Sequence, residues 1–464
     1  MTFEEACRLV EAVLESRWKS AEETERMMRL EKEKRAIMGF EEDMDEYRHD
    51  IGQIICEEGI ENVEFPPWYR TLADGVFNEL YGLAGLAPWA YDETEEYKQS
   101  SSAKLIGDRL YCLIDGVSRL QPQTICSSRR EQLKRALLLA SPRERLEYGF
   151  HEVYLRNGIR ITIYSGERTK EGQDVMVFRK YIMRDLTFDE MVRLKTIPPE
   201  AAELFKVMAD IGFNVLFAGP VRSGKTTFMQ TWQCCERRNL EGLAISTDPE
   251  TPWHKLMPGV PLMQLVADGE ELEELTKSLL RGDNDYVLLE EMRDAAAYRL
   301  CLDIISTGTH RSKATVHTSD PVNMPFRMAS RICERYGGSL RGVIQQIFSG
   351  FGYVLELCSR EDNRGEKRLK ALWEYCYDPE HDIPSVHLLC SYDEASDDWR
   401  WKFHMGEDKK KTGSLNCKGI REMERIMREL EKRNPITEKT VIYPRYYRPQ
   451  IMENPERERE RYSL

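Results

Sequence analysis

The sequence predicts an α/β fold with a parallel sheet in its main domain. In the second half of the chain, short apolar runs alternate with helical stretches, which is the order of elements in a parallel sheet covered by helices. These runs occupy residues 214–218, 243–247, 286–289, 314–317 and 353–357. A glycine-rich turn follows the first run and leads directly into a helical stretch, as expected for a strand, a loop and a helix in succession.

A smaller mixed α/β domain is expected before this region. Residues 109–114 and 159–164 have the alternation of strands, and residues 131–140 have the spacing of a helix. Further upstream the chain is rich in Glu, Lys, Arg and Met, with apolar residues at helical spacing, which indicates charged helices. The expected division is 1–65 for an N-terminal helical segment, 66–185 for the mixed α/β domain, 186–407 for the parallel-sheet domain with a C-terminal helical part, and 408–464 for a charged, partly disordered extension.

Composition excludes several classes of protein. The 464 residues are 41% hydrophobic, which is enough for buried cores in about three domains. The formal net charge is −13, so the chain lacks the positive field that holds nucleic acid through its phosphates. The longest stretch without a charged residue has 14 residues, fewer than the ~20 that cross a bilayer, and the N-terminus carries early acids. We therefore expect a cytoplasmic protein with no transmembrane helix and no nucleic-acid partner.

The twelve cysteines are scattered along the chain. They form no C-x-x-C pair, and only Cys234 and Cys235 are adjacent. This spacing indicates neither a disulfide framework nor a four-ligand zinc site. We expect the cysteines to serve as small apolar residues.

The sharpest motif is the stretch GPVRSGKT at residues 219–226, which matches G-x-x-x-x-G-K-[ST]. Glycines let backbone amides approach phosphates, and the helix that follows supplies partial positive charge. We expect Lys225 to reach the β and γ phosphates of ATP and the Thr226 hydroxyl to bind Mg²⁺. The alternative is an ordinary glycine turn before a core helix. The predicted phosphate-binding residues are Gly219, Pro220, Val221, Arg222, Ser223, Gly224, Lys225, Thr226 and Thr227.

Two acids end a later apolar run, and a histidine ends the next one. Glu291 is the candidate for polarising an attacking water, and Glu290 for assisting at the metal through a bridging water. Alternatively, both acids end a strand and cap the next helix. His317 is a candidate sensor of the γ-phosphate or, equally, a satisfied core histidine.

These motifs and their order resemble the type II/type IV secretion ATPases, the hexameric motors of secretion systems and pili. The resemblance is collinear from about residue 76 to 400. It includes LRNGIR at 155–160, VFRK at 177–180, STDPE at 246–250, EEMR at 290–293, and Thr307, Gly308, Ala314, Thr315 and His317 of the histidine box. The branch that looks nearest is that of the tight-adherence (Flp) pilus.

The resemblance implies a RecA-like core and further nucleotide-binding residues. It carries phosphate contacts onto Arg160 and Arg179, which could otherwise form surface salt bridges. It also implies Asp248 and Glu250 in the acidic box, Arg281 before the acidic strand, and His310 in the histidine box after a one-residue shift. The chain departs from the family at Glu290, where the family has glycine, and at Thr309, where it has the first histidine.

Two functions remain open at this point. The first is a Mg·ATP-hydrolysing motor that works as a homo-hexamer against an inner-membrane platform protein. Such a motor would associate peripherally, through partners, with the cytoplasmic face of the inner or plasma membrane. The second is a nucleotide-binding subunit that hydrolyses ATP weakly or not at all, which the departures at Glu290 and Thr309 favour. A nucleic-acid motor with the same core is disfavoured by the negative charge.

Overall fold

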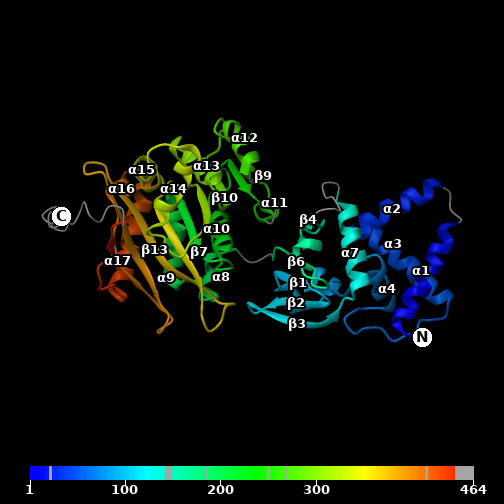
Figure 1. Cartoon of the computed structure of the whole chain (residues 1–464). Coiled ribbons are helices and arrows are strands. Elements are labelled where there is room, and N and C mark those ends of the chain that lie inside the picture. Colours follow the sequence, from blue (N-terminus) through cyan, green and yellow to red (C-terminus); the bar gives the residue numbers. More distant parts are fainter. Residues whose placement is uncertain are drawn as a thin grey trace. The chain divides into compact units, whose positions relative to one another are not determined.

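The computed structural model describes residues 1–19, 23–141, 149–182, 186–247, 251–267, 269–412 and 416–444. The chain divides into two compact units, Met1–Met183 and Arg184–Leu464 (Figure 1). Within the described residues, no helix has the length and apolar character needed to cross a membrane.

The first unit begins with amphipathic helices. They are α1 (Phe3–Lys19), α2 (Glu23–Ile37), α3 (Glu41–Glu57) and α4 (Leu72–Leu80). Val10, Ile51, Val76 and Phe77 are fully buried in a shared core. The helices expected in the first 65 residues are therefore present, and they pack with α4 from the following segment.

An antiparallel sheet forms the rest of this unit. Its strands run in the order β3-β2-β1-β6-β5-β4, and α7 (Ser127–Ala140) buries Leu133 and Leu137 in the core shared with the sheet. The strands are β1 (Ser102–Ile106), β2 (Arg109–Ile114), β3 (Val117–Thr124), β4 (Phe150–Tyr154), β5 (Arg160–Tyr164) and β6 (Val175–Arg179). Short helical turns complete the unit: η1 (Ala84–Leu86), α5 (Ala87–Ala90), α6 (Glu95–Lys98) and η2 (Gly166–Arg168).

The second unit is built on a ten-stranded sheet whose parallel part has the order β12-β7-β11-β10-β8-β9. These strands are β7 (Val215–Gly219), β8 (Gly242–Ser246), β9 (Leu262–Val266), β10 (Tyr286–Met292), β11 (Lys313–His317) and β12 (Tyr353–Ser359). An antiparallel meander extends the sheet beyond β12. It consists of β13 (Lys367–Asp378), β14 (Ile383–Asp393) and β15 (Asp398–Trp401), and β16 (Val441–Ile442) also pairs with β14.

Helices contribute to two separate hydrophobic cores against this sheet. One core takes residues from α8 (Phe188–Arg193), α9 (Pro199–Ile211), α10 (Lys225–Cys234) and α11 (Trp253–Leu256). The other takes residues from α12 (Gly269–Leu279), α13 (Ala295–Ser306), α14 (Met324–Tyr336) and α15 (Leu340–Gly350). The expected α/β fold, with a parallel sheet between helices and a smaller mixed domain before it, is confirmed.

The region after residue 407 is partly integrated into this unit. Helix α16 (Glu407–Thr412) is followed by α17 (Cys417–Arg433), which buries Met423, Met427 and Leu430 against α9. Its charged residues lie on the opposite face of the helix. This highly charged sequence therefore forms an amphipathic helix. The ERERER stretch at residues 456–461 lies outside the described residues.

Candidate functional site

The predicted phosphate loop lies at the carboxyl end of β7, between that strand and α10. Gly219 has φ +149°, and a Cβ there would collide with the carbonyl of Leu357 and lie 2.7 Å from Ser223 Oγ. Gly224, with φ +91°, is the N-cap of α10. Both positions therefore require glycine because their φ angles are positive. At Gly219 the close approach of the Leu357 carbonyl is a second reason. The first amides of α10 have no partner within the helix and are available to an anion.

Side chains of the loop fit a phosphate and a metal ion. Ser223 is 1% exposed, and its Oγ has no hydrogen-bond partner among the described residues. A buried hydroxyl without a partner is costly, so a ligand oxygen at this position would relieve it. Thr226 is exposed at the start of α10, where its hydroxyl is accessible to a cation. Pro220, Val221 and Arg222 form the exposed part of the loop.

Lys225 connects the loop to the neighbouring strand. It is 6% exposed, and its Nζ donates a hydrogen bond of 2.7 Å to the Pro220 carbonyl. The same Nζ lies 3.2 Å from His317 Nδ1 at the end of β11. Burial lowers the pKa of Lys225 to about 8, although the charge of Glu291 acts in the opposite direction. The ammonium group is therefore only partly compensated, as suits a group that receives phosphate charge.

His317 continues this connection to Glu291. Its Nε2 lies 2.8 Å from Glu291 Oε1, so one imidazole bridges the lysine and the carboxylate. Since a charged Lys225 donates to Nδ1, the proton of the neutral ring belongs on Nε2, where it is donated to Glu291. His317 is thus part of the polar site and not of the apolar core.

Glu291 has an unusual backbone conformation for its residue type. Its φ is +67°, at a bulge where the pairing of β10 with β11 shifts register. Its backbone N–H donates to Thr315 Oγ1 at 2.8 Å, and its Oε2 accepts from Arg293 at 2.5 Å. Burial raises the pKa of this carboxyl, but hydrogen bonds and charge from Arg293 and His317 outweigh it and leave the pKa lowered. Strained conformations of this kind persist where surrounding contacts hold them, frequently at functional sites.

Sequence reasoning did not identify Arg293 or Thr315 as partners of Glu291. Arg293 was visible in the stretch EEMR, where an arginine two residues after the acid is the only signal. Thr315 could be placed beside Glu291 only by the register of β10 with β11.

Glu290 has a different environment from Glu291. It is 8% exposed and accepts a hydrogen bond of 3.0 Å from the Trp253 indole. Glu291 instead contacts His317 and Arg293, so the two acids have different partners. This hydrogen bond gives Glu290 a structural partner, and its role at a metal stays a prediction.

Two predicted residues lie away from the loop within one chain. Arg281 precedes β10 and His310 precedes β11, so both are at the amino edge of the parallel strands. The loop is at the carboxyl edge, across about 13 Å of strand. The structure therefore does not bring Arg281 and His310 to this chain's own loop. Asp248 and Glu250 lie outside the described residues.

The two predicted arginines of the first unit are neighbours. Arg160 on β5 and Arg179 on β6 are paired in register. Arg160 also donates to Glu152 at 2.9 Å, and Arg179 is exposed. The two cationic residues therefore lie side by side on adjacent strands. Their contact with nucleotide stays a prediction.

A glycine loop at the carboxyl end of a central parallel strand, with a buried lysine and an acid on a nearby strand, is the arrangement typical of P-loop nucleotide-binding sites. Residues 168–374, which contain all these elements, match the family described as Type II/IV secretion system protein. The match makes this part of the chain similar to that family. The Flp-pilus branch is not distinguished by it.

One curated relative and several solved structures are similar to the chain. An uncharacterized protein of Methanocaldococcus jannaschii is 25% identical over 136 residues, which are 28% of this chain and 50% of the relative. The chain thus spans half the length of that relative.

The similar structures include the VirB11 ATPase of the Brucella suis type IV secretion system, with 17% identity, TM-score 0.33 and coverage of 63% of this chain and 95% of that one. The pilus retraction motor PilT, solved with ADP, has 14% identity, TM-score 0.46 and coverage of 75% and 94%. The ATPase DotB of Legionella pneumophila has 14% identity, TM-score 0.43 and coverage of 76% and 94%.

Proposed function

We propose that the chain is an ATP-hydrolysing motor of a secretion or pilus-assembly system. The observation that carries this is the continuous polar connection from Lys225 through His317 to Glu291, at the end of a glycine loop within a family-matched segment. A simple glycine turn would not need a buried lysine or a strained acid beside it.

ATP with Mg²⁺ is the ligand that these residues fit. The amides at the start of α10, Ser223 Oγ and Lys225 would hold the phosphates, and the Thr226 hydroxyl would bind the metal. When bound, the γ-phosphate is the group that hydrolysis transfers to water. Release of Lys225 from the Pro220 carbonyl would let its ammonium turn toward that charge.

Glu291 is the proposed group that orients the attacking water. Its lowered pKa keeps the carboxyl ionised at neutral pH, and an ionised carboxylate accepts a hydrogen bond from water. His317 holds Glu291 relative to Lys225, so a change at the phosphates would be transmitted to the acid. In this proposal the first unit moves against the second during the cycle, with Arg160 and Arg179 as phosphate contacts.

Assembly and location follow the family resemblance. We propose a homo-hexameric ring in the cytoplasm that acts on an inner-membrane platform protein, without nucleic acid as a partner. The Flp-pilus branch is the finer assignment. In a ring, Arg281 and His310 would be available for contact with nucleotide held by a neighbouring copy, since they lie at the edge opposite the loop.

The second candidate is a nucleotide-binding subunit with little turnover. The hydrogen bond from Trp253 to Glu290 favours it, because a carboxylate that already accepts from a buried indole is less available to a metal. Binding of ATP would then regulate assembly rather than drive movement.

Steady-state ATP hydrolysis, measured at several protein concentrations alongside mass by light scattering, separates these functions. We expect Mg²⁺-dependent phosphate release that rises more than linearly with protein and falls by at least about 100-fold in Glu291→Gln. Glu334→Gln is the matched control, because Glu334 is an exposed acid on α14 in an ion pair with Arg331. ATP binding without turnover in the unmutated chain would select the regulatory subunit instead.

A further inference from the structure

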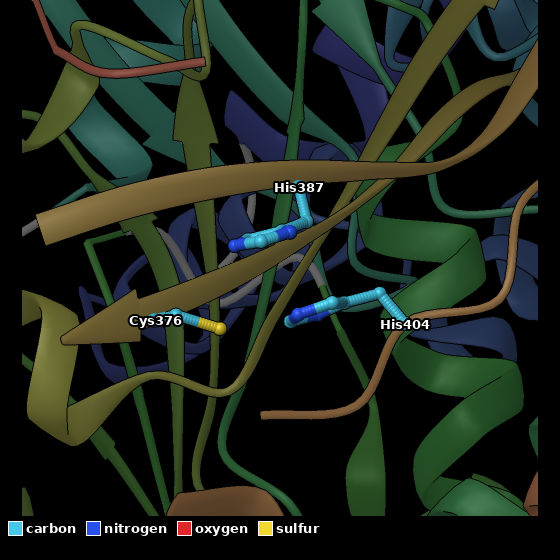
Figure 2. Close-up of side chains that lie close together, drawn as sticks. All are labelled: Cys376, His387 and His404. Carbon is cyan, nitrogen blue, oxygen red and sulfur yellow. The ribbon is translucent and has the colours of Figure 1, made fainter. Parts of the chain in front are cut away.

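Three potential metal ligands meet at the C-terminal meander of the second unit. Cys376 belongs to β13, His387 to β14, and His404 to the segment after β15. Each offers one ligand atom, and these atoms lie within 4.8 Å of one another. Figure 2 shows the three side chains directed toward a common point from three different segments.

The pairing of β13 with β14 creates this convergence. Glu374 is in register with His387, and Cys376 lies two residues further along β13 on the same face. The chain then returns along β15 and continues through residues 402–406, which bring His404 to the same edge. A side chain at Gly406 would have its Cβ 2.9 Å from Cys376 Sγ, so glycine at this position leaves the sulfur room.

A buried carboxylate orients one of the ligands. Glu374 is fully buried, and its Oε2 lies 2.5 Å from His404 Nδ1 while its Oε1 accepts from the Gly406 amide at 2.8 Å. With Nδ1 bound in this way, Nε2 of His404 is the nitrogen left for a metal. A carboxylate that holds the second nitrogen of a ligating histidine is a recurrent arrangement around protein metals.

The other ligands are also held in place. His387 is 9% exposed, and its Nε2 lies 3.1 Å from Ser385 Oγ. The rings of His387 and His404 are stacked at 3.6 Å between centroids, with 13° between their planes. These contacts hold both imidazoles in place beside Cys376.

We propose that Cys376, His387 and His404 bind one Zn²⁺ ion. A thiolate with two imidazoles is a donor set that Zn²⁺ accepts, and water or a shifted Glu374 would complete four-fold coordination. The charges balance, since the thiolate and the Glu374 carboxylate together carry two negative charges. On binding, the thiol proton passes to solvent as the zinc–sulfur bond forms. Ligand atoms up to 4.8 Å apart must move inward by about 1 Å to reach bonds of about 2.0–2.3 Å.

The ion would cross-link the segment 402–406 to β13 and β14 through its three ligands. This site lies at the amino edge of the parallel strands, because Glu374 pairs with Tyr353 at the start of β12. It is therefore at the edge opposite the phosphate loop, and its ligands lie beyond the family-matched residues 168–374. The proposal is thus independent of the ATPase assignment.

Metal content of the full chain tests the proposal. After treatment with EDTA and reloading with Zn²⁺, we expect one tightly held zinc per chain by elemental mass spectrometry. Cys376→Ser and His404→Ala should lose it, whereas Cys358→Ser should keep it, since Cys358 is a partly buried cysteine of β12 outside the cluster. Glu374→Gln should weaken binding by about 10–100-fold. Zinc content that is unchanged by Cys376→Ser overturns the proposal.

A second measurement needs no substitution, so it stands even if a variant fails to fold. Zn²⁺ should slow alkylation of Cys376 in the unmutated chain, read by peptide mass spectrometry, and leave the exposed Cys56 and Cys417 unaffected. Equal alkylation of Cys376 with and without Zn²⁺ contradicts the site. Retention of Cu²⁺ but not Zn²⁺ at equal concentrations overturns the choice of ion. Nucleotide affinity should be the same in the loaded and stripped protein.

Discussion

The two edges of the sheet in the second unit use charged side chains in different ways. At the loop edge, Lys225, His317 and Glu291 form an open connection in which His317 retains 35% side-chain exposure. At the opposite edge, Glu374 is fully buried and holds His404 and the Gly406 amide in fixed positions. In the proposed site, the side chains at the loop edge can exchange their present partners for a ligand. Those at the opposite edge stay bound to fixed partners. In these proposals, one sheet carries a nucleotide site and a metal site at opposite edges.

The largest expected effect is that of Lys225→Ala, which should lower ATP affinity, whereas a substitution at the opposite edge should not. Loss of a buried ammonium from the phosphate site removes charge-assisted hydrogen bonds, and we expect ATP affinity to fall roughly 100-fold. Cys376→Ser should leave that affinity unchanged because it alters only the other edge. Equilibrium binding of a fluorescent ATP analogue measures both.

Lys370→Ala is the matched lysine control. Its ammonium pairs with Glu356 at 2.7 Å, and its side chain is 51% exposed. It should bind the analogue like the unmutated chain. An equal loss of affinity in Lys225→Ala and Lys370→Ala would mean that general charge, and not the loop, holds the nucleotide.

The end of the meander at the loop edge contains a buried arginine paired with Asp397. Asp397→Asn tests how much this pair contributes to stability. Asp397 lies at the loop edge and accepts from Arg368 Nε at 2.9 Å and from Tyr392 at 2.6 Å. Arg368 is fully buried, so weakening its partner should cost about 2 kcal/mol of unfolding free energy at neutral pH. Urea unfolding of the unmutated and variant chains measures the difference.

The same pair predicts a pH dependence with a defined sign. The hydrogen bond from Arg368 holds the pKa of Asp397 well below its usual range. A lowered pKa gives stability that is present above the unfolded value of about 4 and lost as pH falls below it. The difference in unfolding free energy between the unmutated and Asp397→Asn chains should therefore shrink as the pH is lowered from neutral toward about 3. Urea unfolding repeated across this range measures the change, and a difference that grew on acidification would contradict it.

Asp303→Asn provides the comparison for this effect. Asp303 pairs with Arg299 one turn away on α13, and surface pairs of this kind contribute about 0.5 kcal/mol or less. A loss in Asp303→Asn as large as that in Asp397→Asn would show that burial of Arg368 does not matter. In zinc-loaded protein, EDTA should affect the opposite end of the meander and leave the Asp397→Asn difference unchanged.

Much of the fold could be predicted because its strands either alternate, as β2 does, or are apolar throughout, as β7 is. Residues 109–114 coincide with β2, and 214–218 differ from β7 by one residue. By contrast, β9 was not predicted: its stretch LMQLV is apolar apart from Gln264, but its residues are only half-buried or exposed at the edge of the sheet. The amphipathic α17 was obscured by its many charges. Edge elements have less to bury, so their sequences are less constrained.

The phosphate loop was predictable because its residues are contiguous. The Trp253 contact of Glu290 joins residues 37 positions apart, and no local pattern indicates it. The cluster of Cys376 with two histidines was likewise missed, because its spacing matches no short metal motif and depends on strand register. The expectation that cysteines serve only as apolar residues does not account for Cys376, which is partly exposed beside two imidazoles.

The smallest effect, and the one that tests the loop edge most closely, is that of His317→Asn. An amide at this position can still accept from Lys225 but cannot bridge both partners with the geometry of an imidazole. We expect kcat to fall about 10-fold while ATP affinity changes less than about threefold, because His317 positions Glu291 and binds no phosphate directly in the proposal. His381→Asn, on the exposed hairpin between β13 and β14, is the control. If affinity and kcat fell together in His317→Asn, the histidine would be a ligand of the nucleotide and not the connection between lysine and acid.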